Sequence, residues 1–402
     1  MNAIAFHPAP LLPLRRRWRR AWIAALPVLS GALWLWHSLW GAGAAVQGGL
    51  QAVAVMVYLW VCTDRMLDLN HPPGDPRLHP SLGPANVVTL IRGALIAVLA
   101  GFLFQPPIGP GSPAAWAAWV PALLYLAAAA LDALDGALAR ATGGQTRLGE
   151  RLDGEVDALG LLVASALAVW IGQAPAVFLA AGFGYYLVQA AVGLRRRLGR
   201  PVARVQPRAA ARLTAGCAMG FAVAFLMPVF AAPALVPAAV VITTALTAGF
   251  ALDWLVVCGR AAPDGRLRNS HAARVQQTIE RWLPLALRAG AAAGIGLLLA
   301  RHGGSHPGHL LTGIQQGVLA GGALLAVAGI SARLASAALS LAAAGIDAGL
   351  LADAGWALAA LCAAALIVTG AGRPQLWQPE EPFFLKRISE AAPPPRSKRG
   401  GP

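Results

Sequence analysis

Charged residues are scarce in this chain of 402 residues: they make up 12% of it, whereas hydrophobic residues make up 57%. A soluble protein would have shorter apolar runs, of about 10 to 14 residues. Here, uncharged stretches of about 20 residues recur, which is the length needed to cross a hydrocarbon core. Because lipid offers the backbone no hydrogen bonds, these stretches must be helical. The composition therefore predicts a polytopic α-helical membrane protein.

Cysteine is also rare, and the chain shows no clear signal-peptide cleavage site. The four cysteines lie in or beside apolar segments without paired spacing, which argues against a disulfide framework or a zinc site. The basic N-terminal stretch leads into a long, Trp-rich apolar run without a small-residue cleavage motif, so we expect a membrane helix there. The four residues are Cys62, Cys217, Cys258 and Cys362.

Acidic residues are few, at 17 against 32 Lys and Arg, and the formal charge is +15. Such a charge could suggest a nucleic-acid partner, but the chain offers no soluble basic module with interleaved aromatics or a docking helix. The basic residues lie between the apolar runs instead. We therefore expect no nucleic-acid partner, and attribute the basic run 195–212 to topology and attraction to anionic lipids.

The apolar runs predict twelve helices. We place them at 22–40, 44–62, 86–104, 115–140, 148–172, 174–194, 210–229, 233–257, 283–300, 310–330, 334–351 and 354–371. No convincing internal repeat is present.

The basic residues also predict the orientation. If the N-terminus is cytoplasmic, the outer loops retain essentially only Arg301, and short cytoplasmic loops are the ones enriched in Lys and Arg. The sequence thus predicts a multi-pass protein of the inner, cytoplasmic membrane with both termini inside. The inner segments would be Arg15 to Arg20, Arg65 and Arg77, Arg140 to Arg151, Arg195 to Arg212, Arg260 to Arg281, Arg333 and the basic tail.

Composition shifts divide the chain into six parts. Pro and Gly residues mark a linker between two leading helices and a six-helix core, and four further helices precede a Pro-rich, charged tail that we expect to be disordered. The parts are 1–63 (basic segment and two helices), 64–85 (cytoplasmic linker), 86–258 (six-helix core), 259–282 (basic loop), 283–371 (four helices) and 372–402 (tail).

The stretch LDALDGALARATGGQTRLGERLDGEVDALG is unusual because it sets aspartates at the ends of apolar helices, where carboxylates cost several kcal/mol unless compensated. Asp132 and Asp135 are spaced i, i+3, and Asp153 and Asp157 are spaced i, i+4, so each pair shares one helix face. The two pairs can converge across the Gly143–Gly144 turn and face the cytoplasm. Four carboxylates in one place suit Mg²⁺ or Mn²⁺, and can hold two ions.

The run reads D-x2-D-G-x2-A-R-x8-G-x3-D-x3-D, and it resembles the signature of the CDP-alcohol phosphatidyltransferase family (class I) at all eight fixed positions. PANVVTLIR, from Pro84 to Arg92, resembles the entry segment of the same family, with its Asn, Thr and Arg. The resemblance covers roughly 170 residues. It implies an all-α, polytopic transmembrane bundle with a six-helix core, to which this chain adds about two N-terminal and four C-terminal helices.

The resemblance also implies roles for individual residues. Asp132, Asp135 and Asp153 are expected to bind the metal, and Asp157 to be the catalytic base and also a metal ligand. The residues expected to border the cytidine diphosphate are Asn86, Thr89, Gly136, Ala139, Arg140 and Gly149.

The implied activity is a metal-dependent phosphotransfer in phospholipid biosynthesis. An alcohol acceptor would attack CDP-diacylglycerol or a related CDP-alcohol and release CMP, among membrane lipids; a homodimer is one option for the assembly. The alternative is a membrane transporter or scaffold with a carboxylate ion site. Outside the signature positions, we expect Glu150 and Glu155 to face water or pair with Arg147 and Arg151, and Asp253 to have a local hydrogen-bonded role.

Overall fold

The computed structural model describes residues 11–302, 313–328 and 353–370, apart from residues 76, 110, 143–144, 207, 231 and 268–269. The predicted helix at 334–351 and the predicted tail at 372–402 lie outside the described residues. Every other predicted segment coincides with a described helix, and no strand occurs among the described residues. The expected all-α membrane fold is confirmed.

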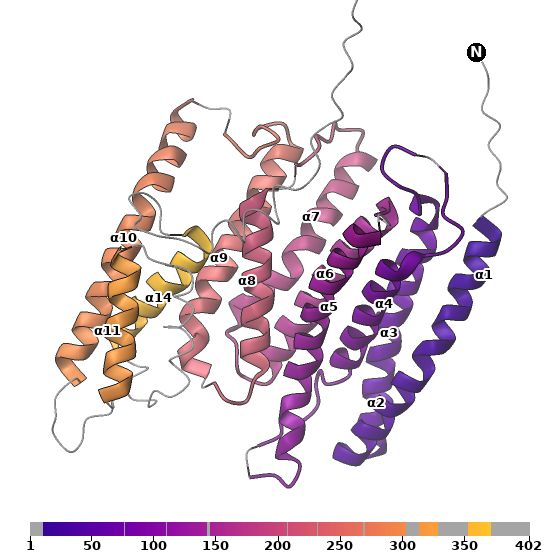
Figure 1. Cartoon of the computed structure of the whole chain (residues 1–402), viewed down its shortest axis with the longest axis horizontal. Coiled ribbons are helices and arrows are strands. Elements are labelled where there is room, and N and C mark those ends of the chain that lie inside the picture. Colours follow the sequence, from indigo (N-terminus) through magenta and orange to yellow (C-terminus); the bar gives the residue numbers. More distant parts are fainter. Residues whose placement is uncertain are drawn as a thin grey trace, which may run out of the picture. The chain divides into compact units, whose positions relative to one another are not determined.

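The helices run in chain order as labelled in Figure 1. They are α1 (Leu11–Ala21), α2 (Ala25–Trp40), α3 (Ala42–Met66), α4 (Gly83–Ala100), α5 (Val120–Thr142), α6 (Arg147–Trp170), α7 (Leu179–Arg197), α8 (Ala209–Leu226), α9 (Ala232–Val257), α10 (Ser270–His302), α11 (Gly313–Ala328) and α14 (Ala354–Thr369).

Seven helical runs of the described chain are long and apolar enough to cross a membrane. They are Leu11–Trp40, Ala42–Leu69, Gly83–Ala100, Ala115–Gly136, Ala176–Arg197, Leu235–Val257 and Arg274–Arg301. The 24-residue helix α6 is not among them, because its first half holds two glutamates besides Asp153 and Asp157. Helix α6 is thus long enough to cross a membrane, but it carries more charged residues than the seven apolar runs.

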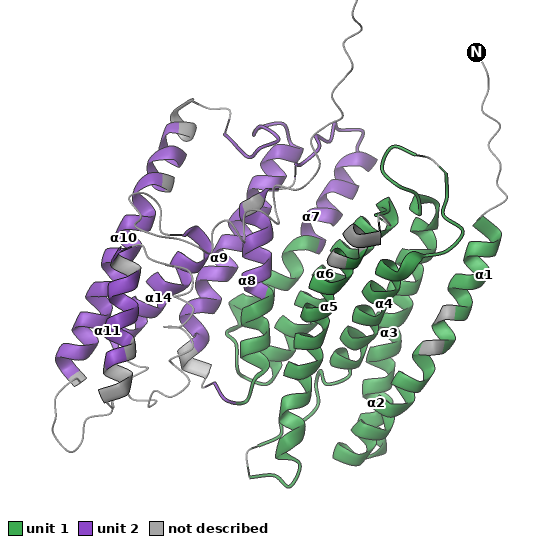
Figure 2. Cartoon of the chain, viewed as in Figure 1, with its two compact units in different colours: residues 1–185, 219–228 green, residues 186–218, 229–402 purple. Residues whose placement is uncertain are grey.

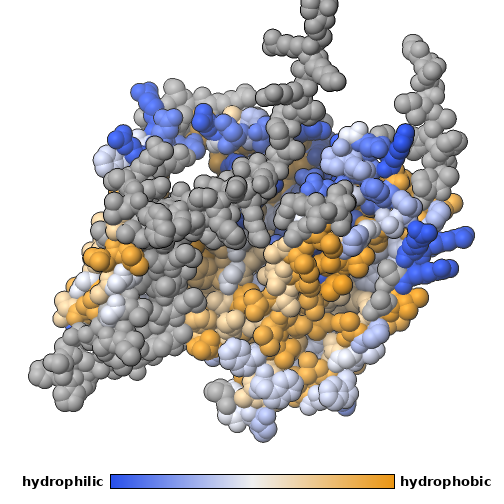
Figure 3. All heavy atoms as spheres, viewed as in Figure 1, coloured by the Kyte–Doolittle hydropathy of each residue, from blue (hydrophilic) through white to orange (hydrophobic). Residues whose placement is uncertain are grey.

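The chain forms two compact units, coloured separately in Figure 2. Unit 1 comprises residues 1–185 and 219–228, and unit 2 comprises residues 186–218 and 229–402. Unit 1 contains α1 to α6 whole, together with the start of α7 and the end of α8. In Figure 3, hydrophobic side chains cover the middle of its helices on the visible face, as expected for a surface solvated by lipid.

Helix α4 is the centre of unit 1 and contacts α2, α3, α5 and α6. Trp36 of α2 is fully buried, and it packs where Gly101 ends α4 and where Gly48 lies in α3. A Cβ at Gly101 would lie 2.1 Å from the Trp36 ring, so no larger residue fits without a shift. The two leading helices are therefore packed directly against the helix that opens the predicted core.

The basic segment Arg15 to Arg20 precedes the first predicted helix, at 22–40, but it is itself helical and lies in α1. Leu14 and Trp18, spaced i, i+4, share one face of α1 and are buried in a cluster with Leu67, Leu82 and Leu148. The segment thus packs on the linker and on the first turn of α6. The arginines between these two apolar residues point elsewhere and are exposed.

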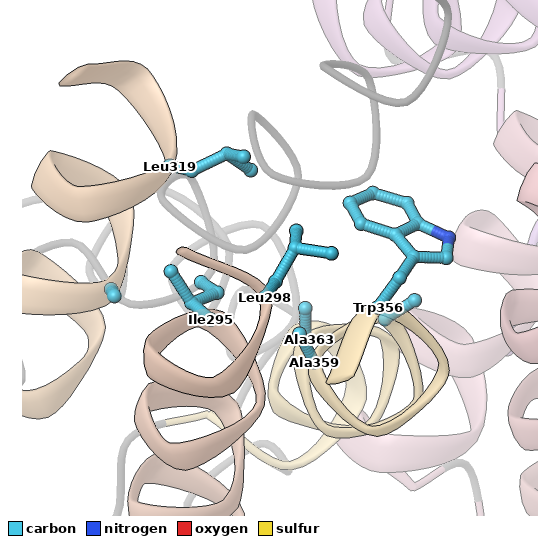
Figure 4. Close-up of a cluster of buried hydrophobic side chains, with 8 residues drawn as sticks. Ile295, Leu298, Leu319, Trp356, Ala359 and Ala363 are labelled. Atoms are coloured by element: carbon cyan, nitrogen blue, oxygen red, sulfur yellow. The ribbon is translucent and has the colours of Figure 1, made fainter. Parts of the chain in front are cut away.

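Unit 2 has its own core, formed by α10, α11 and α14. Figure 4 shows Trp356 and Ala359 of α14 beside Leu298 and Ile295 of α10, with Leu319 of α11 nearby. All five are buried. The trailing helices are therefore held by apolar packing.

Candidate active site

The four aspartates of the predicted signature come from two helices of unit 1. Asp132 and Asp135 lie near the end of α5, and Asp153 and Asp157 lie in the first half of α6. One carboxylate oxygen of each of Asp132, Asp135 and Asp153 lies within 4.8 Å of the others. The predicted convergence across the turn between these helices is therefore present for three of the four aspartates.

Arg92 of α4 joins all four carboxylates. Its Nη1 lies 2.9 Å from Asp132 Oδ1, 2.9 Å from Asp135 Oδ2 and 2.5 Å from Asp153 Oδ1. Its Nη2 donates a hydrogen bond to Asp157 Oδ1. Arg92 is 2% exposed, so the guanidinium is a buried cation surrounded by four anions.

A second polar residue of α4 supports the same cluster. The hydroxyl of Thr89, one turn before Arg92, donates a hydrogen bond of 2.9 Å to Asp135 Oδ2. Asp135 is 6% exposed and accepts from both Thr89 and Arg92. Each of these bonds goes to a charged acceptor, the stronger class of hydrogen bond. They compensate the cost of burying this carboxylate.

Asn86 and Gly149 lie together where α4 meets the start of α6. The Thr146 side chain caps α6 by accepting from the Gly149 backbone N–H at 3.0 Å. Asn86 Nδ2 donates to the Leu82 carbonyl at 2.6 Å and lies 3.4 Å from Thr146 Oγ1. A Cβ on Gly149 would lie 2.5 Å from Asn86 Oδ1. The small size of Gly149 thus permits close contact between α4 and α6.

The remaining predicted nucleotide contacts lie on α5. Gly136 directly follows Asp135 and is partly buried. Ala139 and Arg140 belong to the last turns of the same helix, but their side chains lie outside the described residues.

Glu155 was expected to face water or to pair with Arg147 or Arg151, but it does neither. Its carboxylate accepts hydrogen bonds from Tyr58 of α3 at 2.8 Å and from Tyr185 of α7 at 2.9 Å. It lies two residues from both Asp153 and Asp157, and therefore on a different face of α6. The prediction failed because the sequence does not indicate which helices flank that face.

The carboxylate cluster has the chemistry of a divalent-cation site. Four carboxylates against one guanidinium leave three formal negative charges uncompensated among these five side chains. Carboxylate oxygens are preferred ligands of Mg²⁺ and Mn²⁺, and a guanidinium already lies where a cation is favourable. The residues present therefore fit a divalent cation.

Arg92 ends the motif PANVVTLIR, and its contacts with the aspartates were not predicted from the sequence. The available signal was its position, because an arginine within an apolar helix normally has a buried partner or a function. Asp253, expected to have a local role, pairs with Arg208 within unit 2 at 2.5 Å, which confirms that expectation.

Comparison with known proteins agrees with this geometry. Residues 83–255 match the family model described as CDP-alcohol phosphatidyltransferase. No curated protein and no solved structure matches the chain significantly. The matched residues contain Arg92, all four aspartates and the helices that hold them. The region from residue 83 to residue 255 belongs to the CDP-alcohol phosphatidyltransferase family.

Proposed function

We propose that this chain is an integral membrane transferase of phospholipid biosynthesis. It transfers a phosphatidyl-type group from CDP-diacylglycerol to the hydroxyl of an alcohol and releases CMP. The observation that supports this best is the buried cluster of Arg92 and four aspartates inside the region that matches the family. A bundle held together by apolar packing alone would not need it, since each buried charge is costly.

In this proposal, Asp132, Asp135 and Asp153 hold divalent cations, Mg²⁺ or Mn²⁺, and Asp157 can also contribute. When bound, the cations neutralise the diphosphate of the donor and stabilise the charge on the leaving phosphate. Gly136, Ala139, Arg140 and Gly149 border the cytidine diphosphate, where the sequence also predicts Asn86 and Thr89. The contacts of Asn86 and Thr89 described above favour an indirect part for these two residues, through the packing of α4 and the support of Asp135.

Asp157 is the proposed general base. It accepts the proton of the acceptor hydroxyl, and the freed oxygen forms a bond to the phosphorus next to the lipid moiety. The bond from that phosphorus to the bridging oxygen of the diphosphate breaks. CMP leaves with the bridging oxygen and its electron pair, and Asp157 releases the proton to solvent.

The proposed location is the inner membrane, with both termini and the carboxylate cluster facing the cytoplasm. The basic segments between the helices support this orientation, because short cytoplasmic loops are enriched in Lys and Arg.

The test is release of CMP by purified protein from CDP-diacylglycerol, with glycerol phosphate, inositol phosphate, serine and choline as acceptors. We expect activity with Mg²⁺ or Mn²⁺ and none after chelation. Asp157→Asn should lower kcat at least about 100-fold, the contribution of a general base. Asp64→Asn is the matched control, because Asp64 pairs with Arg15 outside the cluster at 3.5 Å.

Two results would overturn the proposal: no CMP release with any acceptor, or equal activity of Asp157→Asn and the wild type. Either would favour the alternative, a transporter or scaffold in which the cluster is an ion site.

A further inference from the structure

A small cavity lies beside the Arg92–Asp157 pair, between α4, α5, α6 and Met219 of α8. Three polar side chains line it, those of Arg92, Asp157 and Tyr125, and the rest of its wall is apolar or glycine, including Ile96 and Gly160. The volume open to the centre of a water-sized sphere is about 10 Å³. This volume is at the lower limit for one water molecule or a single hydroxyl group.

Two of these lining residues each have a buried polar atom without a partner in the described part of the chain. Arg92 Nε and Tyr125 Oη are both buried, and neither has a hydrogen-bond partner among the described residues. Tyr125 is 3% exposed, and the two terminal nitrogens of Arg92 are already bonded to the aspartates. An unsatisfied buried polar atom is unfavourable, and native structures usually satisfy it with protein or with ordered water.

The position of the cavity in the bundle separates it from the substrate side. Tyr125 lies seven residues before Asp132 on α5, which is about 10 Å along the axis. Gly160 follows Asp157 on α6 by three residues. Both therefore lie on the far side of the aspartates from the turn that joins α5 and α6, deeper in the bundle. A group in this cavity would contact the carboxylate cluster on the side away from the α5–α6 turn.

We propose that this cavity binds one water molecule, and that through it Tyr125 is a positioning residue for Asp157. The water accepts hydrogen bonds from Arg92 Nε and from the Tyr125 hydroxyl, and it donates to the Asp157 carboxylate. This gives it three partners, the usual number for a buried water. It satisfies both unpartnered atoms and fixes the orientation of the carboxylate. The role in catalysis rests on the proposed function, in which Asp157 is the base.

The test compares Tyr125→Phe with the wild type in the full-length protein. Phenylalanine keeps the ring and removes only the hydroxyl, so the melting temperature should stay within a few degrees. We expect kcat for CMP release to fall about 3- to 10-fold, the effect of one hydrogen bond. The KM values for donor and acceptor should change less than about twofold, because this site touches neither substrate. Tyr186→Phe is the matched control. Tyr186 does not line the cavity, so removal of its hydroxyl should leave kcat unchanged.

A structure at a resolution that shows ordered water provides a second readout, independent of activity. We expect density within hydrogen-bond distance of Tyr125 Oη, Arg92 Nε and Asp157, and its loss or displacement in Tyr125→Phe. Absence of density there, with other buried waters visible, would overturn the water site. An unchanged kcat in Tyr125→Phe would overturn the positioning role.

Two further outcomes separate the possible errors. A raised KM for the acceptor at unchanged kcat would mean that the hydroxyl in this cavity belongs to the acceptor, which overturns the assignment to water. A wild-type protein that releases no CMP would overturn the proposed function and the positioning role with it, whereas the density would still decide the water site.

Discussion

Replacing Arg92 by methionine is the sharpest test of the electrostatics of the carboxylate cluster. Methionine keeps an unbranched side chain and removes the charge. In the absence of divalent cations, the four aspartates would then face one another without a compensating cation. We therefore expect a large loss of stability in the metal-free protein.

The magnitude follows from the exposure of each partner. The side chains of Arg92 and Asp135 are 3% and 8% exposed, and breaking a buried pair of this kind costs about 3–5 kcal/mol. The side chains of Asp132, Asp153 and Asp157 are 38%, 42% and 29% exposed, so their pairs should add only about 0–1 kcal/mol each. The expected loss is thus roughly 3–8 kcal/mol, most of it from the pair with Asp135.

Divalent cations should reverse part of this loss, because they supply the charge that Arg92 provided. A ligand that binds only the folded state stabilises it in proportion to its affinity, and in the wild type a cation must share the carboxylates with the guanidinium. The rise in melting temperature on adding Mg²⁺ or Mn²⁺ should therefore be larger for Arg92→Met than for the wild type.

The assay is thermal unfolding in detergent or nanodiscs, with EDTA and with each metal. Arg301→Met is the control, because Arg301 is half-exposed and pairs with Asp353 at 3.0 Å, an interaction worth only about 0–1 kcal/mol. The reasoning is refuted if Arg92→Met and Arg301→Met are destabilised equally in EDTA. A metal-induced shift that is the same in Arg92→Met as in the wild type would refute it as well.

Three other predictions follow from the packing and the charge pattern. Gly149→Ala should cost about 1–3 kcal/mol of stability, because its methyl group would lie against Asn86 Oδ1, whereas Gly154→Ala should be tolerated, since nothing lies within 4 Å of that position; equal melting temperatures of the two variants would contradict this. Tyr58→Phe should cost about 1.5–3 kcal/mol through the lost bond to Glu155, and an unchanged melting temperature would rule it out. A fluorescent protein fused after residue 402 should fluoresce and a phosphatase fused there should be inactive, as for a cytoplasmic terminus; the reverse pattern would invert the topology.

The aspartate pairs could be predicted because their spacing lies within single helices. Residues three or four apart share a helix face whatever the rest of the fold, so Asp132 with Asp135 and Asp153 with Asp157 required no tertiary information. That the two pairs converge followed from the short turn between their helices. The helices could also be predicted from local information, because each corresponds to a single run of sufficient length and apolar character.

The contacts of Arg92 and Glu155 could not be predicted, because they depend on which helices are neighbours. Arg92 reaches the cluster only because α4 packs against both α5 and α6. Glu155 is bonded by tyrosines from α3 and α7, which lie far from it in the sequence. No periodicity within α6 encodes those partners. The sequence also did not predict that Arg15 to Arg20 are helical. The apolar face of this helix consists of little more than Leu14 and Trp18, and it is buried only because it packs on the linker.

The folded unit around the carboxylate cluster begins earlier in the chain than the family match does. This follows from the apolar cluster of Leu14, Trp18, Leu67, Leu82 and Leu148. The family match begins at residue 83, yet Leu148, in the first turn of α6, is covered by residues that precede it. The backbone N–H of Arg147 donates to the carbonyl of His71 at 3.0 Å, again across that limit. A chain cut at residue 83 would expose an apolar patch and an unsatisfied helix end just upstream of Asp153. The smallest piece of this protein worth expressing therefore begins at or before residue 11.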